Sequence, residues 1–157
     1  MMRVSDNHIS YEIHPDVCAG TIGRDATLPW PVLQMNQVHD VQVAVVDRPD
    51  VTPDELDGFD AMVTDLAGLA IGVRTADCIP ILLYDPVRKS AAAVHSGWRG
   101  TVAKILRNVI TKMSNVYGTQ PSDLIAVIGP GICTDCFQVG EEVALKFKEA
   151  GFNLDSV

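Results

Sequence analysis

The sequence is poor in basic residues and has no long basic run. Its 12 lysines and arginines stand against 20 aspartates and glutamates, which gives a formal net charge of −8. The longest basic run is Arg88-Lys89. Binding to a nucleic acid or to an anionic membrane requires a cluster of positive charge. We therefore expect no nucleic acid or membrane partner and favour a function that acts on small molecules.

Long apolar runs and cysteines are also scarce. No segment approaches the roughly 18 uninterrupted apolar residues that cross a bilayer. The first residues, MMRVSDNHISYE, lack the charged and apolar regions of a signal peptide, so we expect a cytoplasmic protein. The four cysteines, at positions 18, 78, 133 and 136, are too few for a secreted disulfide scaffold. They are more typical of thiols or metal ligands.

What the sequence does contain is a mixture of strand and helix patterns over 157 residues, about the size of one domain. We predict an α/β fold, a mixed sheet with flanking helices, as a single domain over residues 1–157. Residues 48–60 combine Pro, Asp and Gly without apolar periodicity, which predicts a surface loop. Strand patterns occupy residues 9–13, 69–73, 81–84, 91–94 and 124–129, with two further β-rich runs within 32–47.

Helical spacing begins at Thr101. Apolar residues then recur at the spacing of one helix face from Val102 to Met113. Thr101 is the predicted N-cap and Gly118 the predicted C-terminal stop. A second amphipathic helix is predicted over residues 140–151, with two glutamates in its first turn, where the helix dipole favours anions.

Three residues with metal-ligating side chains interrupt apolar sequence at the ends of predicted elements: His39, Cys78 and His95. Three nitrogen and sulfur ligands hold zinc with a fourth position open, as in catalytic zinc sites. The alternative is that Cys78 is a small core residue and that the histidines are hydrogen-bonded packing residues. The spacing leaves both interpretations open, because only the fold can bring the three side chains together.

Cys133 and Cys136 form an isolated Cys-x-x-Cys pair. A structural zinc site would need a second pair, which the sequence lacks. The preceding Gly-Pro-Gly is not a helix start that would lower a thiol pKa, which weakens a thioredoxin-like role. The favoured interpretation is two thiols near a cleft. The zinc nucleobase deaminases are excluded, because no His or Cys is followed two residues later by Glu.

Charged residues near these positions could serve the same site. Asp60, Asp65 and Asp77 could each orient a histidine or transfer a proton, and Asp77 is the best candidate of the three. The alternative for Asp77 is a turn residue that bonds the local backbone. Arg74 and Arg99 carry the planar guanidinium that suits phosphate or carboxylate, and their alternative role is a salt bridge.

Five motifs in order resemble the YfiH/laccase-domain family, whose members were called polyphenol oxidases and are now regarded as multifunctional purine nucleoside phosphorylases. The resemblance runs from about Asn36 to Val143. It lies in NQVH (36–39), DGFDAMVTD (57–65), GVRTADCIPILLYDP (72–86), AVHSGWRGTV (93–102), and IGPGI with FQVG (within 128–140).

The resemblance implies the α/β fold particular to that family, with His39, Cys78 and His95 as zinc ligands. It also implies a site that cleaves adenosine, inosine and methylthioadenosine with phosphate to the free base and ribose 1-phosphate, and that deaminates adenosine. In such a reaction Arg74 and Arg99 would hold phosphate and Asp77 would move a proton. The candidates for contacting the substrate are Asn36, Ser96 and Trp98.

The sequence departs from the family in two places. Ser96 stands where members usually carry Ala, which adds a hydroxyl near the metal ligands. Members also continue well beyond Val157, with further strands and an Arg-containing motif, so we expect the chain to lack the C-terminal part of the domain.

Two other functions stay open. A copper-dependent polyphenol oxidase is one, because two His and one Cys with a weak axial Met, here Met35 or Met62, is also a blue-copper ligand set. The number of histidines argues against the oxidase, because four histidines cannot build both this site and a trinuclear copper cluster. The other is a non-catalytic zinc- or purine-binding protein. The sequence does not reveal an oligomeric state.

Overall fold

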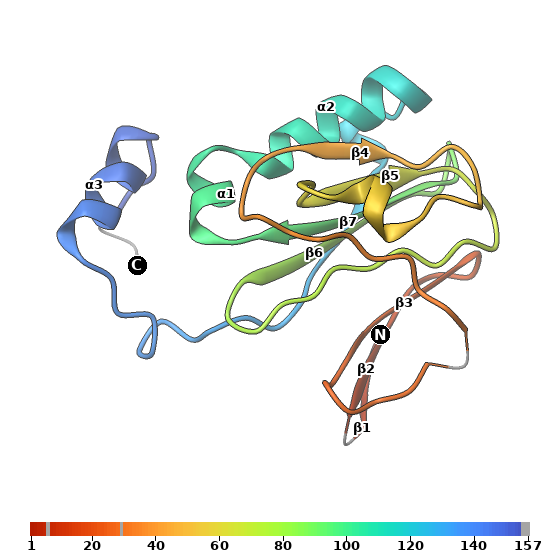
Figure 1. Ribbon diagram of the computed structural model, residues 1–157, viewed down its shortest axis with the longest axis horizontal. Coiled ribbons are helices and arrows are strands. Elements are labelled where there is room, and N and C mark those ends of the chain that lie inside the picture. The colour runs from red at the N-terminus through yellow and green to blue at the C-terminus, as the bar shows by residue number, and fades with distance from the viewer. Residues whose placement is uncertain (6, 29, 155–157) are drawn as a thin grey trace.

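The computed structural model describes residues 1–5, 7–28 and 30–154. Within these residues the strands form two sheets (Figure 1). The smaller is an antiparallel sheet of β1 (Met2–Ser5), β2 (His8–His14) and β3 (Val17–Ile22). The prediction of a strand over residues 9–13 is confirmed by β2. Figure 1 shows this sheet beside the larger one, below the loop that leads into β4.

The larger sheet has the strand order β4-β5-β7-β6-β8. The bounds are β4 (Val43–Val45), β5 (Ala61–Thr64), β6 (Ile79–Asp85), β7 (Ser90–Ser96) and β8 (Ile125–Ile128). β4 pairs parallel with β5 and the other neighbours pair antiparallel, so the sheet is mixed as predicted. The strands predicted over 81–84, 91–94 and 124–129 are confirmed.

Helix α2 (Ile105–Tyr117) lies along one face of this sheet (Figure 1). Its apolar stripe of Ile105, Val109 and Met113 is fully buried against alternate residues of the strands, among them Val63 and Val94. The opposite face of the sheet carries a second apolar cluster, which includes Met35, Val46, Leu56, Met62 and Ala93. Because side chains alternate along a strand, β5 contributes Val63 to one cluster and Met62 to the other.

The helix predicted from Thr101 to Gly118 is interrupted. A short α1 (Trp98–Val102) precedes α2, and Lys104 between them has a left-handed backbone with φ of 63°. Thr101 therefore lies inside α1, whose N-cap is Gly97, and the predicted N-cap is wrong. Gly118 does end α2, in the left-handed conformation that glycine adopts without a steric penalty.

Three strand predictions need correction. Residues 69–73 form no strand, and Ile71 makes only an isolated bridge with Leu33. The two β-rich runs expected within 32–47 reduce to β4 alone. The strand β5 lies in a stretch for which none was predicted. The loop over 48–60 is confirmed and contains a 3-10 turn, Pro53–Leu56.

The remaining elements lie late in the chain. A 3-10 turn, Pro121–Asp123, precedes β8, and α3 (Glu141–Glu149) confirms the helix predicted over 140–151. In Figure 1, α3 stands apart from the larger sheet at the end of a long connection. Among the described residues, no helix has both the length and the apolar character needed to cross a membrane.

Candidate metal centre

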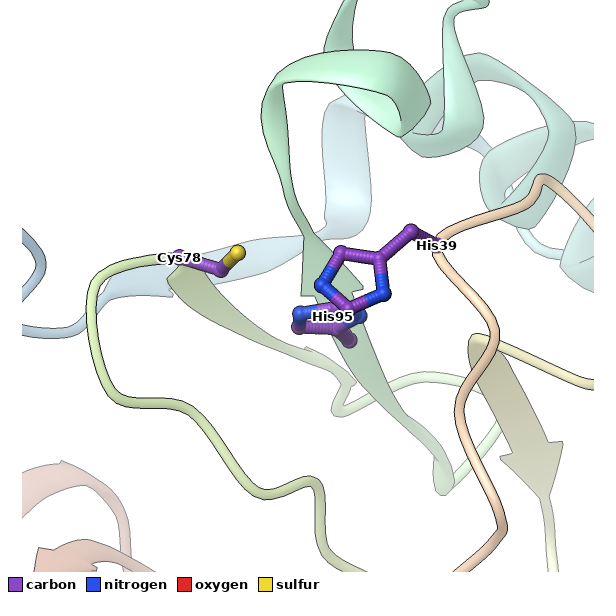
Figure 2. A group of neighbouring side chains, drawn as sticks. All are labelled: His39, Cys78 and His95. Carbon is purple, nitrogen blue, oxygen red and sulfur yellow. The ribbon is translucent and has the colours of Figure 1, made fainter.

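The structure brings His39, Cys78 and His95 together. Each offers one ligand atom, and these atoms lie within 4.8 Å of one another. His95 is buried in β7, Cys78 directly precedes β6, and His39 lies in the loop before β4. Antiparallel pairing sets Pro80 of β6 opposite His95, which brings Cys78 to the same end of the sheet. Figure 2 shows the three side chains gathered there.

The buried carboxylate of Asp60 fixes the orientation of His95. Asp60 directly precedes β5, which pairs with β7, so the His95 amide donates to the Asp60 carbonyl oxygen at 2.8 Å. Nδ1 of His95 lies 2.7 Å from Oδ1 of Asp60. A carboxylate only accepts hydrogen bonds, so Nδ1 must donate, which leaves Nε2 of His95 free to bind a metal.

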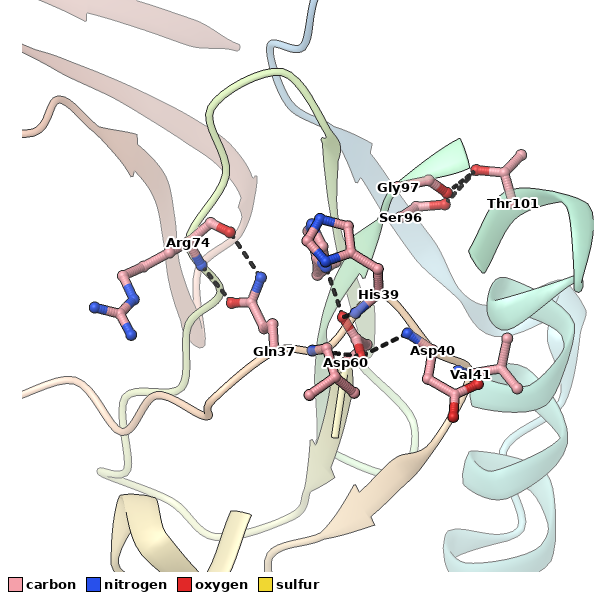
Figure 3. Close-up of polar contacts among 11 residues, drawn as sticks. Gln37, His39, Asp40, Val41, Asp60, Arg74, Ser96, Gly97 and Thr101 are labelled. Atoms are coloured by element: carbon pink, nitrogen blue, oxygen red, sulfur yellow. Dashed lines mark hydrogen bonds and ion pairs between the residues drawn. The ribbon is translucent and has the colours of Figure 1, made fainter. Parts of the chain in front are cut away.

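The same carboxylate also holds the loop of His39. The amide of His39 donates to Oδ1 at 2.9 Å and that of Asp40 donates to Oδ2 at 2.8 Å (Figure 3). The amide of Val38 also donates to Oδ2, at 3.1 Å. Wrapping three consecutive amides around one carboxylate requires a sharp turn, and His39 accordingly has a left-handed backbone with φ of 64°. That conformation costs about 1–2 kcal/mol for a residue other than glycine. Asp60 thus stabilises a strained loop that presents His39.

Gln37 joins the two loops that carry His39 and Cys78. Its side-chain nitrogen donates to the carbonyl oxygen of Arg74 at 2.7 Å, and its side-chain oxygen accepts from the amide of Arg74 at 2.8 Å (Figure 3). The Gln37 side-chain amide thus bonds the backbone of Arg74 as a residue of a neighbouring strand would, and it links the NQVH and RTADC segments. Gln37 therefore sets the distance between the walls of the site.

Gly97 leaves room for the ligands. A Cβ at this position would lie 3.1 Å from Sγ of Cys78 and 3.2 Å from Cδ2 of His39. Both distances are shorter than ordinary van der Waals contacts. The glycine between β7 and α1 therefore lets the backbone approach the site closely.

The electrostatics of the site differ between its two acids. Burial raises the pKa of the Cys78 thiol, and the nearby carboxylates of Asp77 and Asp60 raise it further. Burial would also raise the pKa of the Asp60 carboxyl. The hydrogen bonds from His95 and from the amides of Asp40, Val38 and His39 outweigh this and hold that pKa below its usual value. Asp60 is therefore ionised at neutral pH.

A pocket of about 380 Å³ opens beside the three candidate ligands. Two other predicted site residues line it, namely Arg74 and the exposed Asp77. The guanidinium of Arg74 extends away from His39 in Figure 3. The described lining residues are Met35, Gln37, His39, Arg74, Thr75, Ala76, Asp77, Cys78 and His95.

The other four predicted site residues are not among the residues that line this pocket. Asn36 is exposed, and its carbonyl oxygen accepts from the amide of Gly58 at 3.2 Å. The buried Ser96 hydroxyl lies 2.8 Å from the hydroxyl of Thr101 (Figure 3) and faces a second pocket, of about 530 Å³, beside α2. Trp98 and Arg99 belong to α1.

The Arg99 guanidinium lies 4.5 Å from the Trp98 ring centroid. Trp98 is thus engaged by a cation rather than by a residue of the pocket that carries the metal ligands. Arg99 is exposed on the same short helix. The structure leaves both residues beside the centre without bringing them into it.

Sequence reasoning underrated Asp60 and missed Gln37. Asp77 was favoured to orient a histidine because it adjoins Cys78, but the carboxylate that contacts a histidine is Asp60. The only sequence signal for Asp60 was a carboxylate at the edge of an apolar run. Gln37 carried no signal beyond its place in NQVH.

Comparisons with known proteins match the chain to one family. The family model described as "Multi-copper polyphenol oxidoreductase laccase" matches residues 19–156. "Adenosine deaminase RL5" from an unknown prokaryotic organism is 45% identical over 127 residues, which make up 77% of this chain and 48% of the relative. "Purine nucleoside phosphorylase SCO2081" from Streptomyces coelicolor is 39% identical over 140 residues, covering 89% of this chain and 56% of the relative.

A solved structure shares the fold. The hypothetical protein YfiH from Bacillus licheniformis superposes with a TM-score of 0.73 at 29% identity, over 80% of this chain and 49% of that protein. The chain thus spans about half the length of the proteins it resembles.

Proposed function

The chain belongs to the multi-copper polyphenol oxidoreductase laccase family, and from that premise we propose that it forms the metal-binding part of a zinc-dependent purine nucleoside phosphorylase. The proposed substrates are adenosine, inosine and methylthioadenosine together with phosphate, and the products are the free base and ribose 1-phosphate, which keeps the 5-methylthio group when methylthioadenosine is the substrate. Deamination of adenosine is the proposed second activity. The printed names of relatives, purine nucleoside phosphorylase and adenosine deaminase, support this choice of substrate class.

The observation that carries the proposal is the convergence of His39, Cys78 and His95 at one wall of a pocket. The donors suit zinc, because two imidazoles and one thiolate leave a fourth position open for substrate or water. Asp60 fits the same purpose, since its hydrogen bond to Nδ1 of His95 directs Nε2 towards the ion. A volume of about 380 Å³ falls within the range of small-molecule pockets.

When bound, zinc would supply a Lewis acid that polarises a substrate oxygen or activates water. Residues of the chain would transfer protons, hold phosphate and position the substrate. Asp77 presents an exposed carboxylate to the pocket, placed to accept or deliver a proton. Arg74 is the cation of the described pocket lining, and its guanidinium could hold phosphate after a change of rotamer. Gln37 would keep the two walls at a fixed spacing around the substrate.

The test combines metal content with purine release. Protein purified without added metal is analysed for its elements, and inosine is then incubated with it in the presence and absence of phosphate and separated by chromatography. We expect about one zinc per chain and hypoxanthine release that depends on phosphate. His39→Ala should lose both, while His8→Ala, on the distant β2, should keep both. Full zinc content and full phosphorolysis in His39→Ala would refute the proposal.

A copper-dependent polyphenol oxidase is the second candidate, favoured by the family description and by one residue of the site. Met35 is buried and lines the same pocket as the candidate ligands, so its thioether could join two His and one Cys in a blue-copper ligand set. Met62 lies in the core and does not line the pocket. The other two histidines, His8 and His14, lie on β2, so they do not extend the site.

Visible absorption separates the metals, because a copper thiolate is intensely coloured and zinc is silent. Copper with oxidation of a phenol and no purine release would favour the oxidase. Zinc with purine binding and no turnover would instead favour a binding protein, the third function that the sequence left open.

A further inference from the structure

A pair of thiols lies on the connection between β8 and α3, outside the residues that line the metal-binding pocket. The amides of Cys136 and Phe137 both donate to the carbonyl oxygen of Cys133, at 3.1 and 3.0 Å. A turn closed in this way brings its first and fourth Cα atoms within about 7 Å, and disulfides span roughly 4.4–6.8 Å between Cα atoms. The turn therefore holds both thiols at a spacing suited to a disulfide.

The turn is anchored to the larger sheet at its first end. The amide of Gly129 donates to the carbonyl oxygen of Pro80, and the amide of Ile132 donates to that of Asp77, each at 2.9 Å. Between them, a Cβ on Gly131 would lie only 3.2 Å from the Asp77 carbonyl oxygen, so the two backbones are in close contact. These bonds continue the pairing of β6 and β8 beyond the ends of the strands. Cys133 thus follows a fixed segment.

The two thiols differ in their chemistry. The hydrogen bond from the Cys136 thiol, followed by those from the backbone amides of Cys136 and Asp135, lowers the pKa of Cys133. The hydrogen bond to Cys133 raises the pKa of Cys136. The sequence offered no helix start that would lower the pKa of a thiol at this pair. The structure shows that the backbone amides of the turn take that role instead. A thiol with a lowered pKa beside a protonated partner thiol is the arrangement of an attacking and a resolving cysteine.

We propose that Cys133 and Cys136 form a redox-active dithiol that exchanges with small-molecule disulfides such as oxidised glutathione. The Cys133 thiolate attacks one sulfur of the small disulfide, whose S–S bond breaks and releases one thiolate. Cys136 then gives its proton to solvent and attacks the Cys133 sulfur, which releases the second thiolate. The protein dithiol loses two electrons and becomes a disulfide, and the small disulfide is reduced to two thiols. This site uses none of the proposed metal ligands, so it can be tested independently of the proposed phosphorylase activity.

Peptide mapping of the full chain tests the proposal. Wild-type protein and Cys18→Ser are incubated with oxidised glutathione, quenched with an alkylating reagent, digested and analysed by mass spectrometry. In both proteins we expect a disulfide within the peptide that contains residues 133–136. Cys136→Ser should instead trap glutathione on Cys133. At neutral pH, limited alkylation should modify Cys133 faster than Cys18, which is also exposed, because only thiolates react.

Two results would overturn the proposal. One is glutathione attached to Cys18 while the peptide of residues 133–136 stays reduced. The other is equal alkylation rates at Cys18 and Cys133. Both can be read from wild-type protein alone, so the outcome does not depend on the folding of any variant.

Discussion

Replacing Asp60 by Asn tests how the candidate metal centre is built. Each carboxylate oxygen of Asp60 accepts two hydrogen bonds, Oδ1 from His95 and His39 and Oδ2 from Val38 and Asp40. An acceptor-only group is thus matched to four donors. Asn has one acceptor oxygen, and its NH₂ group must face the donors on the other side.

Both orientations of the Asn amide are unfavourable. With NH₂ towards Val38 and Asp40, two part-buried backbone amides lose their acceptor, at about 1 kcal/mol each, or about 2 kcal/mol in the free energy of unfolding. With NH₂ towards His95, Nδ1 must become the acceptor. The ring proton then sits on Nε2 and blocks the metal. Loss of such a carboxylate partner lowers metal affinity by about 10–100-fold.

The assay measures both quantities. Urea denaturation of the metal-free protein gives the free energy of unfolding, and calorimetric titration gives the zinc dissociation constant. Asp65→Asn is the matched control, because Asp65 is exposed and follows the other end of β5. We expect the control to resemble wild type and Asp60→Asn to lose both stability and affinity. Unchanged unfolding together with an unchanged zinc dissociation constant in Asp60→Asn would refute the described role of this carboxylate.

Three further predictions concern the site and the core. Gly97→Ala should weaken zinc binding, because its Cβ would crowd Cys78 and His39. Gly100→Ala is the control and should bind zinc like wild type, because its Cβ would meet nothing closer than 3.4 Å. Equal zinc dissociation constants for the two variants would contradict this prediction. The raised pKa of Cys78 leaves the thiol protonated at neutral pH, so zinc affinity should rise by about tenfold per pH unit between about pH 6 and 8, with one proton released per ion. Titration calorimetry in buffers of different ionisation enthalpy counts that proton, and a count of zero would show that Cys78 is not a ligand. The buried hydroxyl of Tyr117 has no partner among the described residues, and burial raises its pKa to about 12. Tyr117→Phe should therefore leave the free energy of unfolding unchanged or raise it by about 1 kcal/mol. A loss of stability in urea denaturation would instead reveal a hydrogen bond of the Tyr117 hydroxyl.

The fold could be predicted where apolar periodicity and burial agree. The spacing that predicted α2 is the spacing of its buried stripe, and the short runs at β6 and β7 are internal strands. The strand predicted over residues 69–73 is wrong because their apolar side chains cover a core cluster while the backbone makes only an isolated bridge to Leu33. The break at Lys104 was hidden because the three-residue spacing from Val102 to Ile105 suits a turn as well as a helix.

The candidate site was predicted in part, for a related reason. Ligand chemistry named His39, Cys78 and His95 as candidates and left a packing role open, the family resemblance implied them as ligands, and the structure brings them together. The partner of His95 could not be chosen from the sequence, because Asp60 lies 35 residues away and meets it only through the pairing of β5 with β7. Long-range contacts of this kind depend on strand order, which periodicity does not encode. Adjacency to Cys78 pointed to Asp77 instead.

The hydrogen bonds around Asp60 also bear on how the protein would acquire an ion. They join groups of the protein, and none of them uses the Nε2 atom of His95 that would bind a metal. Ligands held by bonds of this kind can exchange one ion for another while the chain stays folded. Occupancy then follows the free concentrations of competing ions, and copper outcompetes zinc at equal availability. Metal supply in the surroundings, rather than the donor set alone, would decide which ion resides there.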